Sequence, residues 1–173
     1  MEQPQVRKYK MVLVGHEKVG KTSLQFKLTN QPLRQTYTNT VGIDFSSITV
    51  PDKQVRLQIW DTGGQERYHV LVPSYMRDSA MVCFVYSAGS LESFSRLNNL
   101  VQMMREECKH KQPICLLIAN QIDLAGRQVS TETGEQFAFQ NDMLYLEYSA
   151  FNDPRQVLLD KLLEALEKWE LTA

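Results

Sequence analysis

The segment from Gly15 to Thr22, Gly-His-Glu-Lys-Val-Gly-Lys-Thr, combines residue types that can hold phosphate groups. Gly15 and Gly20 allow the backbone to curl so that its N–H groups converge on phosphate oxygens. Lys21 would reach the terminal phosphates as a positive charge, and the Thr22 hydroxyl would ligate magnesium. This is the G-x-x-x-x-G-K-[ST] pattern, which does not distinguish ATP from GTP and which, taken alone, also fits a chance glycine turn before a helix. The residues expected to contact the ligand are Gly15, Glu17, Lys18, Val19, Gly20, Lys21, Thr22 and Ser23.

A second segment, which begins at Trp60, has the residue types needed to act on a terminal phosphate. Asp61 could hold magnesium through water, the Gly64 N–H could face the phosphate, and Gln65 could orient an attacking water. An isolated Asp-x-x-Gly is common, and its alternative interpretation is a glycine-rich surface turn. Together with the phosphate loop, the segment predicts hydrolysis of a nucleoside triphosphate. The residues expected to be catalytic are Lys21, Gly64 and Gln65.

The elements that must position these residues can be predicted from apolar patterns. Four strand-length apolar runs indicate strands covered on both faces, and hence a mostly parallel sheet. Two segments, Phe45–Val50 and Val55–Trp60, flank a Pro-Asp-Lys turn, which predicts an antiparallel hairpin. A further apolar stretch lies near Met143–Tyr148. The four runs are Met11–Val14, Leu57–Trp60, Met81–Tyr86 and Ile114–Ala119.

Helical spacing of apolar residues predicts helices between the strands. One covers 91–104 with Ser90 as its N-cap, and another runs from Ser130, its cap, to about residue 140. The last follows Asp153 and Pro154, interpreted as its N-cap and its first helical residue. The sum is an α/β sandwich: a mostly parallel sheet with one antiparallel edge strand and helices on both faces. Ligands of such sheets bind beyond the carboxyl ends of the strands, so the polar segments should meet there.

The bulk composition narrows the function classes. The chain has 173 residues, 43% hydrophobic and 23% charged, which suits one domain with a buried core. Its formal net charge of −1 offers no basic field for nucleic acid or a membrane. Cys83, Cys108 and Cys115 are expected to be reduced, buried thiols. The sequence has neither a membrane-spanning apolar run nor an apolar signal core at its N-terminus, so we expect a cytoplasmic protein.

Two segments resemble a known family. Ile59–Tyr68 is similar to the switch II signature of Rab-type small GTPases of the Ras superfamily, with Gly63 where they usually carry alanine. Thr40–Phe45 resembles their switch I, and the similarity runs from about Lys8 to Trp169. The resemblance implies a P-loop NTPase fold, a three-layer sandwich with a six-stranded sheet, one antiparallel edge strand and about five helices. It places the GTPase domain at 8–170, after a flexible N-terminus at 1–7.

The resemblance also implies roles for further residues. Thr40 would sense the γ-phosphate. Asp123 would accept two hydrogen bonds from guanine, and adenine, which lacks that donor pair, would leave the carboxylate unpaired. Asn120 would tie the phosphate loop to this segment, and the Ala150 N–H would donate to the guanine carbonyl. The implied cofactors are GTP or GDP with Mg²⁺. Thr22, Thr40 and Asp61 would bind the metal, and Thr40, Gly64, Asn120, Gln121, Asp123, Ser149, Ala150 and Phe151 would complete the nucleotide site.

The departures from this family cluster at the nucleotide. Glu17 stands where a small residue is usual, so its charge and bulk should crowd the catalytic glutamine and slow hydrolysis. The alternative is that Glu17 turns to solvent and Lys18 offsets its charge. Gln121 and Phe151 replace lysines whose stems cover the base, and Leu33 replaces an aromatic residue. We therefore expect guanine selectivity to be retained, with weaker affinity and faster exchange.

These features predict a switch that cycles between GDP and GTP in vesicular or other intracellular membrane traffic. The resemblance implies effectors, an exchange factor and an activating protein that bind through Phe45, Trp60 and Tyr75, although core packing is the alternative for Trp60. A guanine-nucleotide scaffold with little hydrolysis is a second hypothesis. A P-loop kinase or ATPase would need an arginine-rich lid that the sequence does not show.

The expected prenylation tail is not found after Trp169. This predicts either that the full-length protein continues further or that it has no lipid anchor. With a lipidated tail, the protein would reach the cytosolic face of an endomembrane. We expect a monomer with no nucleic-acid partner.

Overall fold

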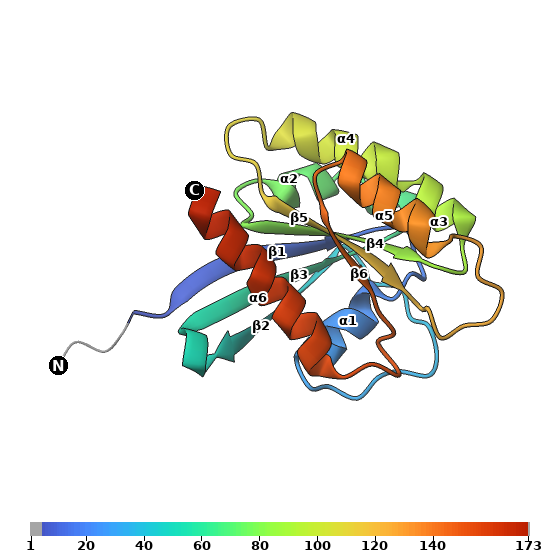
Figure 1. The fold of residues 1–173 in the computed structure, drawn as a ribbon, viewed down its shortest axis with the longest axis horizontal. Helices are drawn as coiled ribbons and strands as arrows, with labels where there is room; N and C mark the ends of the chain where they lie inside the picture. Colours follow the sequence, from blue (N-terminus) through green and yellow to red (C-terminus); the bar gives the residue numbers. More distant parts are fainter. Residues whose placement is uncertain (1–4, 173) are drawn as a thin grey trace.

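The α/β sandwich is confirmed in the computed structural model, which describes residues 5–172 (Figure 1). In this part of the chain, six strands form one sheet in the order β2-β3-β1-β4-β5-β6. β2 runs antiparallel to β3 at the sheet edge, and the other neighbouring strands are parallel. The strands are β1 (Arg7–Val14), β2 (Ile43–Val50), β3 (Val55–Thr62), β4 (Met81–Ser87), β5 (Ile114–Asn120) and β6 (Leu144–Glu147). A flexible N-terminus was expected at 1–7. Residues 1–4 of it lie outside the described residues, and β1 already begins at Arg7.

Helices cover both faces of the sheet. The helices are α1 (Lys21–Leu28), α2 (Val72–Met76), α3 (Leu91–Ser95), α4 (Leu97–Glu107), α5 (Thr131–Gln140) and α6 (Arg155–Thr172), with short 3-10 turns at Pro51–Lys53 and Glu66–Tyr68. Met11 and Leu13 of β1 pack in one core with α1 and α6. Val12 and Val14 point the other way, into a second core with α2, α4 and α5. This alternation along one strand is what places a helical layer on each side.

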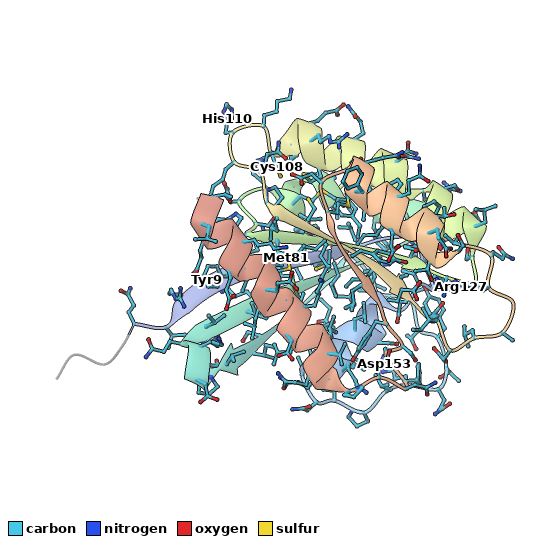
Figure 2. The ribbon with its side chains drawn as sticks, in the orientation of Figure 1. Tyr9, Met81, Cys108, His110, Arg127 and Asp153 are labelled. Atoms are coloured by element: carbon cyan, nitrogen blue, oxygen red, sulfur yellow. The ribbon has the colours of Figure 1, made fainter. Side chains whose placement is uncertain are left out.

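The central strands are buried, as their continuous apolarity predicts. All seven residues of β4 are buried, and Met81 lies in the middle of the packed side chains (Figure 2). Cys83, Cys108 and Cys115 are free and buried, and burial raises the pKa of each thiol. Among residues 5–172, no helix is long and apolar enough to cross a bilayer.

Local signals for helix ends were partly correct. The Ser90 and Ser130 hydroxyls accept hydrogen bonds from the N–H groups of Ser93 and Thr133, so both predicted caps are confirmed. The helix predicted over 91–104 is interrupted at Arg96, which separates α3 from α4. The N-cap expected at Asp153 is wrong. Its carboxylate accepts from the Ser149 N–H at 2.7 Å, and α6 begins only at Arg155, because the loop that precedes the helix takes the carboxylate expected to cap it.

The polar segments meet at one edge of the sheet. The phosphate loop follows β1, residues 63–68 follow β3, and residues 121–130 and 148–154 follow β5 and β6. Because β1, β3, β4, β5 and β6 are all parallel, their carboxyl ends lie on the same side. The fold therefore brings together loops that are far apart in the sequence.

Candidate functional site

The phosphate loop wraps around the Lys21 side chain. The Lys21 ammonium donates to the carbonyl oxygens of Gly15 and His16 at 2.9 and 2.7 Å, which holds it within the curl of the loop. Burial lowers the pKa of Lys21 to about 8, although Asp61 and Glu17 favour its charged form. A buried cation that is hydrogen-bonded only to neutral carbonyls is suited to an anionic ligand such as a phosphate.

Gly20 is required where the phosphate loop enters α1. Its φ of 92° is left-handed, and a Cβ there would lie 2.3 Å from Asn120 Nδ2. This close approach allows Asn120 to donate to the Val19 carbonyl at 2.9 Å, the tie between the two loops expected of Asn120. Gln121, which stands in place of the usual lysine, adds a second tie by donating to the Lys18 carbonyl at 3.0 Å.

The three residues expected to bind magnesium meet in space. Thr22 Oγ1 lies 2.9 Å from Thr40 Oγ1 and donates to Asp61 Oδ2 at 2.5 Å, and Thr40 Oγ1 lies 3.4 Å from the same carboxylate oxygen. The other oxygen of Asp61 is buried and has no hydrogen-bond partner. Two hydroxyls and one carboxylate are the oxygen ligands that Mg²⁺ prefers. These residues therefore fit a magnesium ion, and an ion there would neutralise charge on a bound phosphate.

The environment of Asp61 also suits a cation. The side chain is fully buried, and this burial raises its pKa to about 6, against the lowering by the Thr22 hydroxyl and the Lys21 charge. A buried carboxylate with an unpartnered oxygen is costly unless a positive charge or a donor compensates it. Residues 5–172 contain no group of three histidine, cysteine or acidic side chains that could hold a metal in another way.

The base-reading segments also lie side by side. The Ser149 hydroxyl donates to Asp123 Oδ1 at 2.7 Å, which orients the carboxylate expected to select guanine. Asn120 reaches this region too, because its Oδ1 lies 3.4 Å from the Ala150 nitrogen. Phe151 is exposed, and both it and Gln121 line the pocket. The structure thus brings together both predicted base-reading segments and the phosphate loop.

A partly exposed polar cluster that sequence reasoning missed holds the base-reading loops together. Arg127, in the loop that carries Asp123, donates to the Glu147 carboxylate on β6, just before Ser149. Thr131 Oγ1 and Tyr145 Oη donate to the same carboxylate at 2.8 and 3.1 Å. Burial alone would raise the pKa of Glu147, but these hydrogen bonds lower it. No local motif marks an Arg–Glu pair twenty residues apart.

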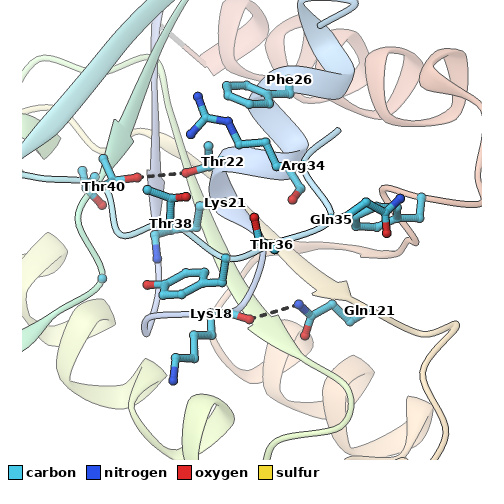
Figure 3. Close-up of a pocket in the computed structure, with 16 residues that line it drawn as sticks. Lys18, Lys21, Thr22, Phe26, Arg34, Gln35, Thr36, Thr38, Thr40 and Gln121 are labelled. Carbon is cyan, nitrogen blue, oxygen red and sulfur yellow. Dashed lines mark hydrogen bonds between the residues drawn. The ribbon is translucent and has the colours of Figure 1, made fainter. Parts of the chain in front are cut away.

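A pocket of about 250 Å³ opens beside these residues (Figure 3). Its lining carries three cationic side chains and no carboxylate, so it favours an anion. The predicted residues that line it are Lys18, Gly20, Lys21, Thr22, Ser23, Thr40, Gly64, Gln121 and Phe151. Gln65 and Asp123 are not among the lining residues. Those that sequence reasoning missed are Phe26, Arg34, Gln35, Thr36, Tyr37, Thr38 and Thr62.

The segment 34–40 accounts for most of the missed lining residues. It has no regular secondary structure, and it folds over the phosphate loop, with the Tyr37 ring 5.7 Å from the Lys18 ammonium. Burial raises the pKa of Tyr37, and the nearby Glu17 charge adds to that effect. Leu33, which stands in place of the usual aromatic, lines a separate depression together with Arg155. A loop without periodicity gives no signal of where its side chains will lie.

Gly63 brings the two switch-like segments into backbone contact. Its N–H donates to the Gly42 carbonyl at 2.8 Å. A Cβ at Gly63 would lie 2.7 Å from the Thr40 carbonyl oxygen and 2.6 Å from Tyr68 Cδ2, and the first of these neighbours is backbone. An alanine at this position therefore requires residues 40–42 to move away, so this departure from the Rab-type pattern has a structural consequence.

We expect Gly63→Ala to separate these segments and to expose the Gly63 amide. Loss of a backbone hydrogen bond worth about 1 kcal/mol should speed hydrogen exchange at this amide roughly fivefold. Hydrogen exchange followed by mass spectrometry or NMR measures the change. Gly89→Ala is the matched control, because a Cβ at Gly89 meets only ordinary contacts of 3.7 Å or more. Unchanged exchange at residues 40–42 and 63 would show that the loops tolerate the methyl group.

The aromatic residues expected at a partner surface form one continuous row. The Phe45 and Trp60 rings meet edge to face at 5.3 Å, and the Tyr75 ring lies 6.0 Å from the Trp60 ring. Phe45 is exposed, whereas Trp60 and Tyr75 are partly buried against the core under α2. Trp60 therefore packs partly against the core and also contacts the exposed Phe45 ring, so both alternatives hold in part.

Comparison with known families agrees with this site. A model of the Ras family matches residues 10–167, which is most of the chain, and the chain therefore belongs to the Ras family of small GTPases. The match covers every loop described above. Members of this family are guanine-nucleotide switches that bind GTP or GDP with Mg²⁺ and hydrolyse GTP. Proteins of this family bind effectors, exchange factors and activating proteins.

Proposed function

We propose that this chain is a Rab-type switch that acts in intracellular membrane traffic and hydrolyses GTP slowly. The convergence of Thr22, Thr40 and Asp61 beside an anion-binding pocket carries the proposal. Thr40 belongs to the segment that folds over the phosphate loop. Its position would therefore depend on which phosphates are bound, as expected when a terminal phosphate and its metal order a switch loop.

The Rab subtype is supported by two features of the chain. The segments 40–45 and 59–68 resemble the Rab switch sequences, and Phe45 and Trp60 from these segments form an aromatic row with Tyr75. Aromatic side chains are suited to interface hot spots, so this row is the proposed docking surface for effectors and for exchange or activating proteins. The proposed location is the cytoplasm, at the cytosolic face of an endomembrane in a lipid-anchored full-length protein.

Nucleotide analysis tests the central part of this proposal. We expect the purified protein to retain GDP or GTP, to release it faster once magnesium is chelated, and to exclude ADP and ATP. Because Gln121 and Phe151 replace base-covering lysines, GDP dissociation should also be faster than in typical members of the family. Retention of adenine nucleotides, or of no nucleotide under any magnesium concentration, would refute the proposal.

Slow hydrolysis is proposed from the position of Glu17. A Cβ placed on Gly64 would lie 2.5 Å from the Glu17 nitrogen, so the backbone before Gln65 is packed directly against Glu17. Glu17 is half-exposed, and its carboxylate favours the charged form of the buried Lys21. A negative charge this close to a terminal phosphate opposes the charge that develops there during hydrolysis.

We expect Glu17→Gly to accelerate single-turnover GTP hydrolysis about tenfold, equivalent to roughly 1.4 kcal/mol of transition-state stabilisation. Glu17→Gln is the matched variant, because it removes the charge and keeps the bulk. Acceleration in both variants would assign the effect to charge, and acceleration only in Glu17→Gly would assign it to crowding. If neither variant hydrolyses GTP faster than the wild type, Glu17 does not limit the reaction.

The position of Gln65 supports a second candidate function, a guanine-nucleotide scaffold with little turnover. Gln65 is not among the residues that line the pocket, so the pocket forms without the side chain expected to orient the attacking water. Single-turnover hydrolysis separates the two candidates. A wild-type protein that keeps GTP intact over hours with magnesium, and stays inert with Glu17→Gly, would favour the scaffold.

A further inference from the structure

Arg34 is a pocket-lining cation that the recognised nucleotide motifs do not include. Of the other two cations that line the pocket, Lys21 is held by loop carbonyls and Lys18 lies beside the Tyr37 ring. The Arg34 guanidinium lies 4.9 Å from the centre of the Phe26 ring. Within residues 5–172, no carboxylate pairs with it. Arg34 is therefore an exposed, unneutralised guanidinium at the rim of an anion-favouring pocket.

The Phe26 ring fixes where this guanidinium lies. Phe26 is only 8% exposed, so it is a firm surface rather than a mobile side chain. It follows Thr22 by four residues and Ser23 by three on α1, and such residues share one face of a helix. A group stacked on Phe26 is thus about one helical turn from the metal-binding hydroxyl. Figure 3 shows Arg34 beside Phe26, on the Thr22 side of the pocket rather than the Gln121 side.

The chemistry of this arrangement favours a phosphate. A guanidinium presents a planar fork of donors that can bind two phosphate oxygens at once. Its stacking on an aromatic ring orients the fork before a ligand arrives, which lowers the entropic cost of binding. We propose that Arg34 contacts the phosphate chain of the bound guanine nucleotide, with Phe26 as the ring that orients it. This inference rests on the proposed function and adds a specific residue to its site.

A nucleotide series tests the contact directly. Binding of guanosine, GMP and GDP to wild-type protein and to Arg34→Ala is measured by calorimetry with magnesium present, and GDP dissociation is followed with a fluorescent analogue. Loss of a charge-assisted phosphate contact should weaken GDP binding about tenfold and speed its release to a similar extent. Guanosine has no phosphate, so its affinity should change less than about twofold. Arg34→Lys, which keeps the charge without the fork, should fall between wild type and Arg34→Ala.

A double-mutant cycle tests the role of Phe26. Phe26→Leu keeps an apolar side chain but removes the ring, and should weaken GDP binding by a smaller factor than Arg34→Ala. In an Arg34→Ala background, the same change should have no further effect on GDP affinity. Lys8→Ala is the matched control, because Lys8 is an exposed cation near the start of β1, away from the pocket, and should leave every affinity unchanged.

The outcomes separate this inference from the function on which it rests. If wild-type protein binds GDP tightly and Arg34→Ala binds it equally well, the phosphate contact is wrong and the switch proposal stands. If Arg34→Ala weakens the binding of guanosine and of GDP equally, Arg34 contacts the base or stabilises the fold. That result would also overturn the proposed phosphate contact. If the wild type binds no guanine nucleotide, the proposed function fails first.

Discussion

Asp123→Ala is expected to weaken GDP binding at least 100-fold and to abolish the preference for guanine over adenine. The Asp123 carboxylate lies at the base end of the site, oriented by the Ser149 hydroxyl at 2.7 Å. Each hydrogen bond to a charged group contributes roughly 1.5–3 kcal/mol, so the loss of two guanine contacts exceeds 100-fold in affinity. Competition of GDP, ADP and xanthosine diphosphate for a fluorescent nucleotide measures the effect. Adenine discrimination should collapse because no carboxylate is then left unpaired.

Two further variants help to interpret a change in GDP affinity or selectivity in Asp123→Ala. Ser149→Ala removes only the orienting hydroxyl and should weaken GDP binding by about tenfold or less, with selectivity retained. Asp52→Ala, at the exposed turn between β2 and β3, removes an equal charge outside the site and should change nothing. Unaltered GDP affinity in Asp123→Ala would mean that another group reads the base, and the assignment of this loop would be wrong.

Asp61→Asn is expected to raise the magnesium concentration needed to retain GDP by about 10–100-fold. Asp61 is the carboxylate to which Thr22 donates and near which Thr40 lies, and its second oxygen is buried without a partner. Asparagine keeps the shape and can still accept from Thr22, but it brings no charge for the cation. GDP dissociation rates across a magnesium titration measure the shift.

The same substitution should have the opposite effect on the protein without nucleotide or metal. Burial of an uncompensated carboxylate is costly, and a neutral amide removes that cost. The free energy of unfolding in chelator should therefore be equal to or higher than that of the wild type, as measured by denaturant titration. Asp52→Asn is the control, because Asp52 lies at the exposed turn between β2 and β3, at the opposite end of these strands from Asp61. A magnesium requirement that stays unchanged in Asp61→Asn would exclude Asp61 from the metal site.

The sequence predicted the architecture well because its signals are local. Continuous apolar runs marked the buried parallel strands, and the hydroxyls of Ser90 and Ser130 cap helices as expected, since each cap depends on residues three positions away. The cap expected at Asp153 was wrong although its competitor is also local. The Ser149 N–H, four residues earlier, donates to the same carboxylate, and residue types alone do not show which N–H that side chain accepts from.

The residues of the candidate site likewise fall into those that the sequence predicted and those that it did not. The residues that can hold phosphate were recognisable from a short motif after a strand, and Thr40 and the base-reading residues were recognisable through the family resemblance. The position of Arg34 on Phe26 and the Arg127–Glu147 pair were not recognisable, because each joins segments that only the folded chain brings together. Residues 34–38 have no apolar period and belong to no recognised motif, so nothing in their sequence indicates that they line the pocket.

The amino-acid sequence by itself determined which chemistry this protein can perform, since the glycines, Lys21, Thr22 and Asp61 follow strands whose ends must lie at one edge of a parallel sheet. The tertiary structure alone decided how closely those groups approach. It places three oxygen ligands within hydrogen-bonding range, sets Gly63 against the Thr40 backbone, and brings Arg34 to the pocket. The physical reason is range: a motif constrains residues within a few positions of one another, whereas distances between loops depend on the packing of the whole sheet and its helices.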